Sequence, residues 1–202
     1  MPLAAPVVSP RTYHHGNLRA ELLERAEQTL ATDGVDALSL RALARDIGVS
    51  HAAPARHFRD RQALLDALAI DGFQRLNRAM QSAARDDAAL RDRFERVGAA
   101  YVEFATTHAA LLGLMYAHKH AEGAPEELVE AGHGSLAVAV DLVVEGQAAG
   151  QVREGDPLRL AQLAFATVHG LAALAAGDLL EGAPLDEMVA LAADGLWRAL
   201  RA

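Results

Sequence analysis

The sequence predicts an all-α protein of about nine helices, with an N-terminal helix-turn-helix unit of three helices and a larger C-terminal helical part. Apolar residues recur at spacings of three and four through most of the 202 residues, which is the period of an α-helix. No stretch shows the period-two alternation typical of a β-strand. Residues 39–61 combine two short helical patterns around a glycine, as a helix-turn-helix does.

The start of the chain predicts an arm followed by a helix. Residues 1–12 contain three prolines and few side chains to bury, so we expect a disordered arm. A helix is expected over residues 17–33, where Leu18, Leu22, Ala26 and Leu30 form one stripe. Gly34 follows this stripe and is expected to end the helix.

Residues 39–61 are the most informative segment. The Ser39 hydroxyl can cap the first helix, because it can accept a hydrogen bond from a first-turn N–H. The apolar face of this helix is made by Leu40, Leu43, Ala44 and Ile47. Gly48 can take the left-handed conformation that ends a helix, and Ser50 can cap a second, short helix. In DNA-binding proteins such a second helix enters the major groove.

Positive charge is concentrated in the same segment. Residues 39–61 hold five arginines and two aspartates, a net charge of +3 in a chain of −8, so the remainder carries −11. An acidic protein that gathers arginines in one place is expected to meet phosphates there. The alternative is a solvated helix pair in an ordinary helical protein, because such turns also join helices that do not bind DNA.

Pro54 constrains the predicted second helix. It lies four residues after Ser50 and lacks the N–H that a helix needs at that position. Either the first turn of this helix is irregular, or the helix begins later than Ser50. Filling the core is another role that Pro54 can have.

Beyond this segment the sequence predicts six further helices. Asp60 can cap a long helix that ends near residue 84 and joins the two parts of the chain. Its inward side chains are expected to be Leu64, Leu65, Leu68, Phe73, Leu76 and Met80. The other helices are expected over residues 88–107, 109–119, 126–149, 157–176 and 185–201. The predicted divisions are an arm over 1–12, a helix-turn-helix domain over 13–60 and a helical domain over 61–202.

The last two predicted helices are candidates for a subunit interface. After its first turn the helix over 157–176 is apolar nearly all round, so it must be buried on several sides. The alternative is one buried helix covered by its own chain. Because symmetric dimers are the commonest oligomers, we expect a homodimer. The candidate interface residues are Phe165, Gly170, Leu171, Leu174, Leu196 and Trp197.

Several other classes of protein find no support in the sequence. The chain has no cysteine, and its histidine pairs His14–His15 and His118–His120 do not converge as metal ligands would, so no metal site is expected. No phosphate-binding glycine loop, G-x-S-x-G elbow or H-E-x-x-H pair is present, so neither catalysis nor a cofactor is predicted. The N-terminus does not read as a signal peptide, and no segment offers about 18 uncharged apolar residues. We therefore expect a soluble, cytoplasmic protein.

With these parts assembled, the chain resembles the tetracycline-repressor (TetR) family of bacterial transcriptional regulators. The resemblance is carried by Leu38-Ser-Leu-Arg-Ala-Leu-Ala44, Gly48-Val-Ser50, His57-Phe58 and Leu64-Leu65. The stretches Glu145-Gly-Gln-Ala-Ala-Gly150 and Val168-His-Gly-Leu171 are similar to a subgroup in which valine or an aromatic residue precedes a C-terminal His-Gly.

The resemblance implies a homodimeric, ligand-responsive repressor that binds a palindromic operator in double-stranded DNA. Its larger half would bind a small molecule and dimerise, and no membrane would be involved. The residues implied in DNA binding are Ser39, Arg41, Ser50, His51, Ala52, Ala53, Arg56, His57 and Arg61. Those implied in lining the ligand cavity are Tyr101, Phe104, His108, Met115, Tyr116, Phe165 and His169. For each of the latter, a place in the ordinary core is the alternative.

One residue departs from the family pattern. Ala55 stands where the family usually has a tyrosine that bonds a DNA phosphate and packs in the DNA interface. The neighbouring Arg56 can compensate for the lost contact. The alternative function is therefore a helical small-molecule-binding protein with weakened or lost DNA binding.

Overall fold

The computed structural model describes residues 18–85 and 88–202, and the all-α prediction is confirmed for them. The arm over 1–12, His14, His15 and the start of the first helix at Asn17 lie outside the described residues. The described chain forms eight α-helices and two 3₁₀ helices. They are α1 (Leu18–Asp33), η1 (Val35–Ala37), α2 (Leu40–Asp46), η2 (Pro54–Arg56), α3 (Arg61–Ala84), α4 (Leu90–Thr107), α5 (Ala109–Lys119), α6 (Glu126–Ala148), α7 (Pro157–Ala176) and α8 (Leu185–Leu200).

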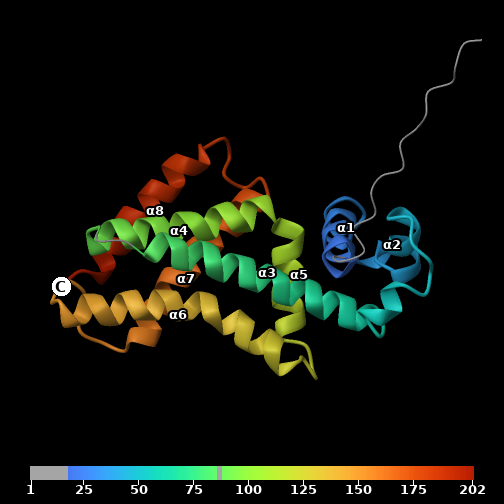
Figure 1. Cartoon of the computed structure of the whole chain (residues 1–202). Helices are drawn as coiled ribbons and strands as arrows, with labels where there is room; N and C mark the ends of the chain where they lie inside the picture. The colour runs from blue at the N-terminus through green and yellow to red at the C-terminus, as the bar shows by residue number, and fades with distance from the viewer. Residues whose placement is uncertain (1–17, 86–87) are drawn as a thin grey trace, which may run out of the picture.

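The helices form two lobes that share the long helix α3. In Figure 1, α1 and α2 lie at one end, and α3 runs from them into the middle of the larger lobe. There α3 packs against α4, α5 and α6, while α5 also contacts α1. The buried apolar side chains make one continuous cluster across both lobes. Because the core is continuous, the predicted domain boundary at residue 60 stays a prediction.

The small lobe is held together by the residues that the helical patterns place inward. Its buried side chains include Leu22, Ala26, Leu30, Leu43, Phe58, Leu64 and Leu68. Asp60 caps α3 as predicted, because its Oδ1 accepts a hydrogen bond from the Ala63 N–H at 2.8 Å. An ion pair of 2.8 Å between Arg25 and Asp46 ties α1 to α2 at the surface. This lobe therefore presents the helix-turn-helix as one packed unit.

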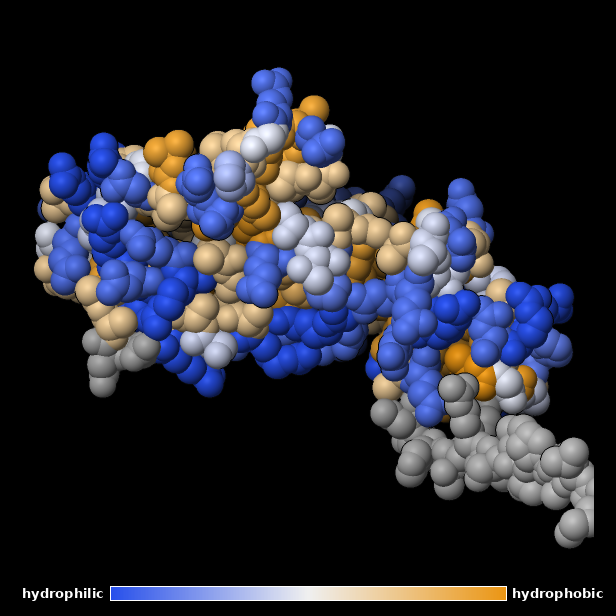
Figure 2. All heavy atoms as spheres, turned by 90° about the horizontal axis from the view of Figure 1, so that it is seen from above, coloured by the Kyte–Doolittle hydropathy of each residue, from blue (hydrophilic) through white to orange (hydrophobic). Residues whose placement is uncertain are grey.

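The larger lobe is built around α3, with α7 packed against α4, α6 and α8. Phe73, Tyr101, Leu111, Met115 and Leu128 are among its fully buried side chains. The view from above in Figure 2 shows that hydrophobic side chains also reach the surface of this lobe. It therefore has apolar surface that its own helices leave uncovered.

Helix α7 is, within the described chain, the one helix long and apolar enough to cross a membrane by length and composition. No segment of about 18 uncharged apolar residues was expected from the sequence, and α7 contains the polar residues Gln162, Thr167 and His169. A helix at the core or interface of a soluble protein has the same length and composition, so this finding is weak support for a membrane span.

The predicted helix cap at Ser50 is wrong, whereas the alternative that the second helix begins later than Ser50 is confirmed, in the form of a short 3₁₀ helix. The structure has no α-helix between α2 and α3 in this described segment, but a turn followed by the 3₁₀ helix η2. Pro54 explains the difference, because without an N–H it cannot donate the bond that would continue a helix from Ser50. Pro54 is also buried, so it fills the core as well. This is why eight α-helices are described where about nine were predicted.

Candidate DNA-binding surface and ligand pocket

The turn after α2 fixes the direction of the segment that follows. The Ser39 hydroxyl accepts a hydrogen bond from the Ala42 N–H at 3.2 Å, so the predicted cap at the start of α2 is confirmed. At the other end Gly48 has φ of 76°, and its N–H donates to the Arg45 carbonyl. The Val49 N–H donates to the Ala44 carbonyl at 2.9 Å. These two bonds make a Schellman motif, which ends the helix and turns the chain sharply.

The segment after the turn is held by short-range hydrogen bonds. The Ala53 N–H donates to the Ser50 carbonyl at 2.9 Å, and the His57 and Phe58 N–H groups both donate to the Pro54 carbonyl at 2.9 Å. Phe58 is buried and anchors the segment in the small lobe. The guanidinium of Arg19 lies 5.7 Å from the centre of the Phe58 ring and covers it. The recognition segment, residues 50–57, is thus a compact bend and not a rod.

The structure places nearly all predicted DNA contacts on the surface. Ala53 is partly buried, and the others are exposed: Ser39, Arg41, Ser50, His51, Ala52, Arg56, His57 and Arg61. Arg41 and Arg56 form no ion pair with another described residue, so their charges are available to a ligand. Arg45 and Arg59 contact their sequence neighbours Asp46 and Asp60 at 3.6 and 3.2 Å while remaining largely exposed. This surface offers several guanidinium groups to an anion, and its role in binding DNA stays a prediction.

Arg61 has a structural partner that the sequence did not indicate. Its Nε donates a hydrogen bond to the Leu38 carbonyl at 2.9 Å, and its Nη2 donates to the Val35 carbonyl at 2.5 Å. These bonds hold the segment before α2 against the start of α3. The predicted phosphate contact would have to use the remaining N–H groups of the same guanidinium.

In the larger lobe, four of the predicted ligand-contacting residues form one aromatic cluster. Tyr101 and His169 are joined by a hydrogen bond of 2.8 Å between the phenol and Nδ1. Phe165 stacks on His169 with ring centres 5.2 Å apart, and Tyr116 lies 5.5 Å from the same imidazole. We call Tyr101, Tyr116, Phe165 and His169 the aromatic cluster. Its members come from three different helices, so the tertiary fold is what brings them together.

The aromatic cluster stands between an internal cavity and an outer cleft. Tyr101 and Phe165 line a cavity of about 40 Å³, which also meets the buried hydroxyl-bearing residue Ser135. Tyr116 and His169 line a cleft of about 260 Å³ on the other side. Small-molecule sites are usually apolar with a few polar groups, and this arrangement has that character. Its internal part is too small for anything larger than a few atoms unless the cluster moves.

Burial keeps both phenols of the cluster in their neutral form. Desolvation raises the pKa of Tyr101 far above its usual value, and it also raises the pKa of Tyr116. A neutral phenol donates one hydrogen bond and accepts others. The cluster can therefore bond a polar group on a ligand without presenting a negative charge to it.

The remaining predicted cavity residues lie elsewhere. Met115 is fully buried, with its Sδ against Gly72, and belongs to the packed core. The rings of Phe104 and His108 are tilted by 44° to each other with centres 4.8 Å apart, and the guanidinium of Arg75 lies over the Phe104 ring. None of these three side chains lines the cavity or the cleft beside the aromatic cluster.

His108 instead belongs to a polar contact between the two lobes. Its Nδ1 lies 2.9 Å from the Glu27 carboxylate of α1. The same carboxylate accepts a hydrogen bond from Arg75 of α3 at 2.5 Å, and this carboxylate is the main reason that the pKa of Arg75 is raised. We call Glu27, Arg75 and His108 the interlobe contact. No sequence pattern indicated it, because its members are separated by 48 and 33 residues.

The predicted interface residues divide into two groups. Phe165, Leu171, Leu196 and Trp197 are buried or partly buried against the chain's own helices. Gly170 and Leu174 are exposed on the outer face of α7, Leu174 to 44%. Leu163 of the same face is 43% exposed, and Leu191 of the neighbouring helix α8 is 65% exposed. We call Leu163, Gly170, Leu174 and Leu191 the outer face.

The predicted divergence of His118 and His120 has a structural counterpart, because His118 lies in the last turn of α5 and His120 follows its end. His118 lies 3.1 Å from the Asp66 carboxylate and so links α5 to α3, whereas His120 is exposed. Among residues 18–85 and 88–202, no three His, Asp or Glu side chains gather as a metal ion would require.

Comparison with protein families gives matches over both lobes. The model described as bacterial regulatory proteins, tetR family, matches residues 22–68. The model described as tetracyclin repressor-like, C-terminal domain, matches residues 94–196. The first of these ranges holds the helix-turn-helix and the second holds the aromatic cluster. Among curated proteins, none matches this sequence.

Solved structures with the same fold include a protein of unknown function from Rhodococcus sp. RHA1. That protein is 56% identical over 95% of this chain and 100% of its own, with a TM-score of 0.89. A TetR family transcription regulator from Marinobacter aquaeolei VT8 is 20% identical over 91% of this chain and 95% of its own, with a TM-score of 0.73. A putative transcriptional regulator of the TetR family from Vibrio parahaemolyticus is 24% identical over 91% and 98%, with a TM-score of 0.69.

Proposed function

This chain belongs to the tetR family of bacterial regulatory proteins and is a DNA-binding transcriptional regulator, and we propose that it is a ligand-responsive repressor that binds a palindromic operator as a homodimer. The observation that carries the proposal is the exposed recognition segment with Arg56, together with Arg41 of α2, two guanidinium groups that form no ion pair with another described residue. We propose that it works in the cytoplasm and carries out no catalysis.

A palindromic operator follows from two copies of the small lobe. In a dimer with two-fold symmetry, the recognition segments would enter successive major grooves, roughly 34–36 Å apart or a multiple of this. The exposed arginines would contact phosphates and His51, Ala52 and Ala53 would face base edges. The outer face of α7 and α8 is the surface that we propose for dimerisation, because it is apolar and uncovered.

We propose that the effector binds at the aromatic cluster. Helix α4 carries Tyr101 and ends one residue before His108, whose imidazole contacts Glu27 of α1. A ligand that parts the cluster would therefore displace α4 and strain the interlobe contact. For the ligand to release DNA, it must bind the two arrangements of the lobes with different affinity.

The experiment that tests the proposal is binding of the protein to DNA by fluorescence anisotropy across a series of salt concentrations. The first duplex is the DNA upstream of the chain's own gene, followed by duplexes selected from a random pool. We expect specific binding that weakens steeply with salt, because phosphate contacts release counterions. Arg41→Ala should weaken binding at least about fivefold and lower the salt slope by about one.

The matched control is Arg78→Ala, which removes an equally exposed guanidinium from α3 in the larger lobe. It should leave DNA affinity nearly unchanged. Failure to select any duplex, or equal losses from the two substitutions, would contradict the proposed DNA surface.

A helical ligand-binding protein with weakened DNA binding is the second candidate function. It is favoured by Ala55, whose exposed side chain offers no hydrogen bond to a phosphate, and by the shortness of η2. Ala55→Tyr distinguishes the two candidates. Much tighter binding to a selected duplex would show that the missing phosphate contact limits affinity, whereas no change would mean that Arg56 or the backbone already supplies it.

A further inference from the structure

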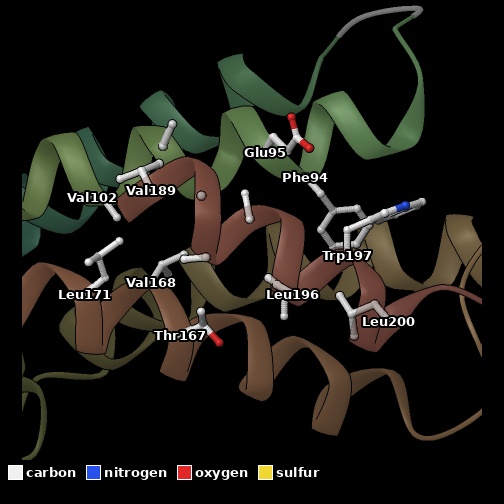
Figure 3. Close-up of a pocket in the computed structure, with 14 residues that line it drawn as sticks. Phe94, Glu95, Val102, Thr167, Val168, Leu171, Val189, Leu196, Trp197 and Leu200 are labelled. Atoms are coloured by element: carbon white, nitrogen blue, oxygen red, sulfur yellow. The ribbon is translucent and has the colours of Figure 1, made fainter. Parts of the chain in front are cut away.

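A groove runs between α4 and α8, apart from the aromatic cluster. It has a volume of about 780 Å³ and opens to solvent. Toward the interior it continues into a narrow apolar slot, which shares Glu95, Ala99, Val102, Val189 and Ala193 with the groove. Figure 3 shows Phe94 and Trp197 together at one end of the slot and Val102 and Val189 at the other. The groove and slot thus form one cleft with an open mouth and an apolar floor.

The slot is small in this structure, but only a few side chains separate it from the internal cavity. The slot has a volume of only about 20 Å³. It shares Phe94, Gly98, Val168 and Leu196 with the internal cavity beside the aromatic cluster. Of these, Val168 and Leu196 lie at the centre of the slot in Figure 3. These side chains would have to rotate to join the two spaces and to make room for an alkyl chain.

The mouth of the groove carries an excess of negative charge. Among the described residues that line it are four carboxylates, Asp92, Glu95, Glu103 and Asp186, and one guanidinium, Arg96. Glu95 forms an ion pair of 2.7 Å with Arg91. In the part of the chain that the structure describes, the other three carboxylates have no ion-pair partner. A cation at the mouth would therefore be attracted from both helices, and an anion would be repelled.

We propose that this cleft binds a small amphiphilic cation, with its alkyl part in the slot and its ammonium group between Glu103 of α4 and Asp186 of α8. A second copy of the chain is a poorer occupant. The groove side of α8 carries Val189 and Ala193, whereas Leu191 of the outer face lies about 200° round the helix from each of them. Dimerisation through the outer face would leave the cleft open. The proposal goes beyond the proposed function, because it requires neither DNA binding nor release.

The fluorescence of Trp197 can report ligand binding in the slot. It is the only tryptophan in the chain, and its ring centre lies 5.9 Å from that of Phe94 at the end of the slot. Titration with octylammonium, octanol and octanoate compares three head groups on the same alkyl chain. We expect octylammonium to change the Trp197 fluorescence at a concentration roughly three- to tenfold lower than octanol, with octanoate weakest, because several solvent-exposed charges act together. In about 1 M salt this ratio should approach one, because exposed charges are then screened.

Three variants and one control locate the site. Glu103→Gln and Asp186→Asn should each weaken octylammonium binding about two- to threefold and leave octanol unchanged. Asp141→Asn, which removes an exposed carboxylate from α6, is the matched control and should change neither. Ala193→Phe should fill the slot and abolish binding of all three compounds, provided that its circular dichroism and melting curve match those of the parent protein.

The outcomes separate clearly. Octanoate binding as tightly as octylammonium would overturn the cationic preference. Binding of octylammonium that survives Ala193→Phe would place the ligand elsewhere and overturn the proposal. Absence of any binding by calorimetry and by Trp197 fluorescence would overturn it as well. None of these results bears on operator binding, which is measured separately.

Discussion

Single residues decide how the recognition segment is presented. Gly48 allows the sharp turn after α2, and Pro54 prevents the next helix from starting at Ser50. Arg61 donates hydrogen bonds to the carbonyls of Val35 and Leu38, so it holds the segment before α2 in place. A sequence does not distinguish an arginine that donates hydrogen bonds to backbone carbonyls from an arginine whose guanidinium is available to a phosphate. Only the fold distinguishes Arg61 from Arg41.

The buried phenol of Tyr101 and the partly buried phenol of Tyr116 make stability fall at alkaline pH. Burial raises the pKa of Tyr101 and of Tyr116, whereas a phenol in the unfolded chain ionises near its usual value of about 10. Above that pH the unfolded state releases protons that the folded state retains, so the free energy of unfolding decreases as pH rises. We expect tyrosinate absorbance near 295 nm to appear together with the loss of helical circular dichroism.

This experiment is best done in a Tyr13→Phe background, so that only Tyr101 and Tyr116 contribute to the tyrosinate absorbance.

Lys119 has the opposite effect on the pH dependence of stability. Burial lowers its pKa, so its loss of a proton favours the folded state as pH approaches about 10.5. Slopes of unfolding free energy between pH 10 and 11 should therefore be compared between variants. Tyr116→Phe should make the slope less negative. Tyrosinate formation at pH 10 with intact helices would contradict the expected burial.

At the scale of the helices, the sequence predicted most of the fold because each helix carries its own period and ends. The predicted ranges 109–119 and 157–176 match α5 and α7, and 17–33 differs from α1 only at Asn17, which lies outside the described residues. The segment after Ser50 was predicted less closely. Pro54 indicated an irregular first turn or a later start for the second helix, and the structure has a turn followed by η2.

The ligand pocket was only partly predictable for a related reason. Helical spacing shows which face of α4 is apolar, but it does not show which helix packs against each part of that face. Tyr101 lies within α4, and His108 directly follows its last residue. Tyr101 meets His169 of α7, whereas His108 meets Glu27 of α1. Which helix covers which part of α4 depends on tertiary packing, and periodicity carries no information about it.

At Gly146 the side chains of Leu90 and Val152 pack directly against the backbone of α6. A Cβ at this position would lie 2.7 Å from Leu90 Cδ2 and would also collide with Val152. We expect Gly146→Ala to destabilise the fold by about 1–3 kcal/mol, because the packed side chains cannot move away without strain. Urea unfolding followed by circular dichroism measures this loss.

Gly113→Ala is the matched control within α5. A Cβ added at Gly113 would meet open space, because no atom of a packed neighbour lies within 4 Å of its position. Alanine is a better helix former than glycine, so this substitution should stabilise the protein by up to about 1 kcal/mol. Equal effects of the two substitutions would show that helix propensity, and not close approach of α6 to Val152, governs Gly146.

At the scale of the whole molecule, the proposed DNA surface and the outer face lie on different lobes. Helix α3 spans both lobes, and the interlobe contact adds a second connection between α1 and the end of α4 (Figure 1). A change in the larger lobe can therefore reach the small lobe through α3 and through the contacts that α1 makes with the larger lobe. In a dimer, the same change would alter the separation of the two recognition segments. That separation must match the spacing of the two half-sites of a palindromic operator.

The outer face makes this arrangement testable with one substitution. Leu174 is 44% exposed on α7, and a guanidinium there would have to be buried without a partner if two copies packed through this face. We expect Leu174→Arg to raise the dimer dissociation constant at least about tenfold, as measured by sedimentation velocity, and to weaken binding to a two-half-site duplex in parallel.

Val144→Arg is the control, because Val144 of α6 is 48% exposed but lies outside the outer face. It should leave the dimer intact. Affinity of Leu174→Arg for a single half-site should also be unchanged, since Arg41 and the recognition segment lie in the other lobe. A Leu174→Arg protein that remains dimeric would exclude this face and would leave the proposed spacing of the two recognition segments without its structural basis.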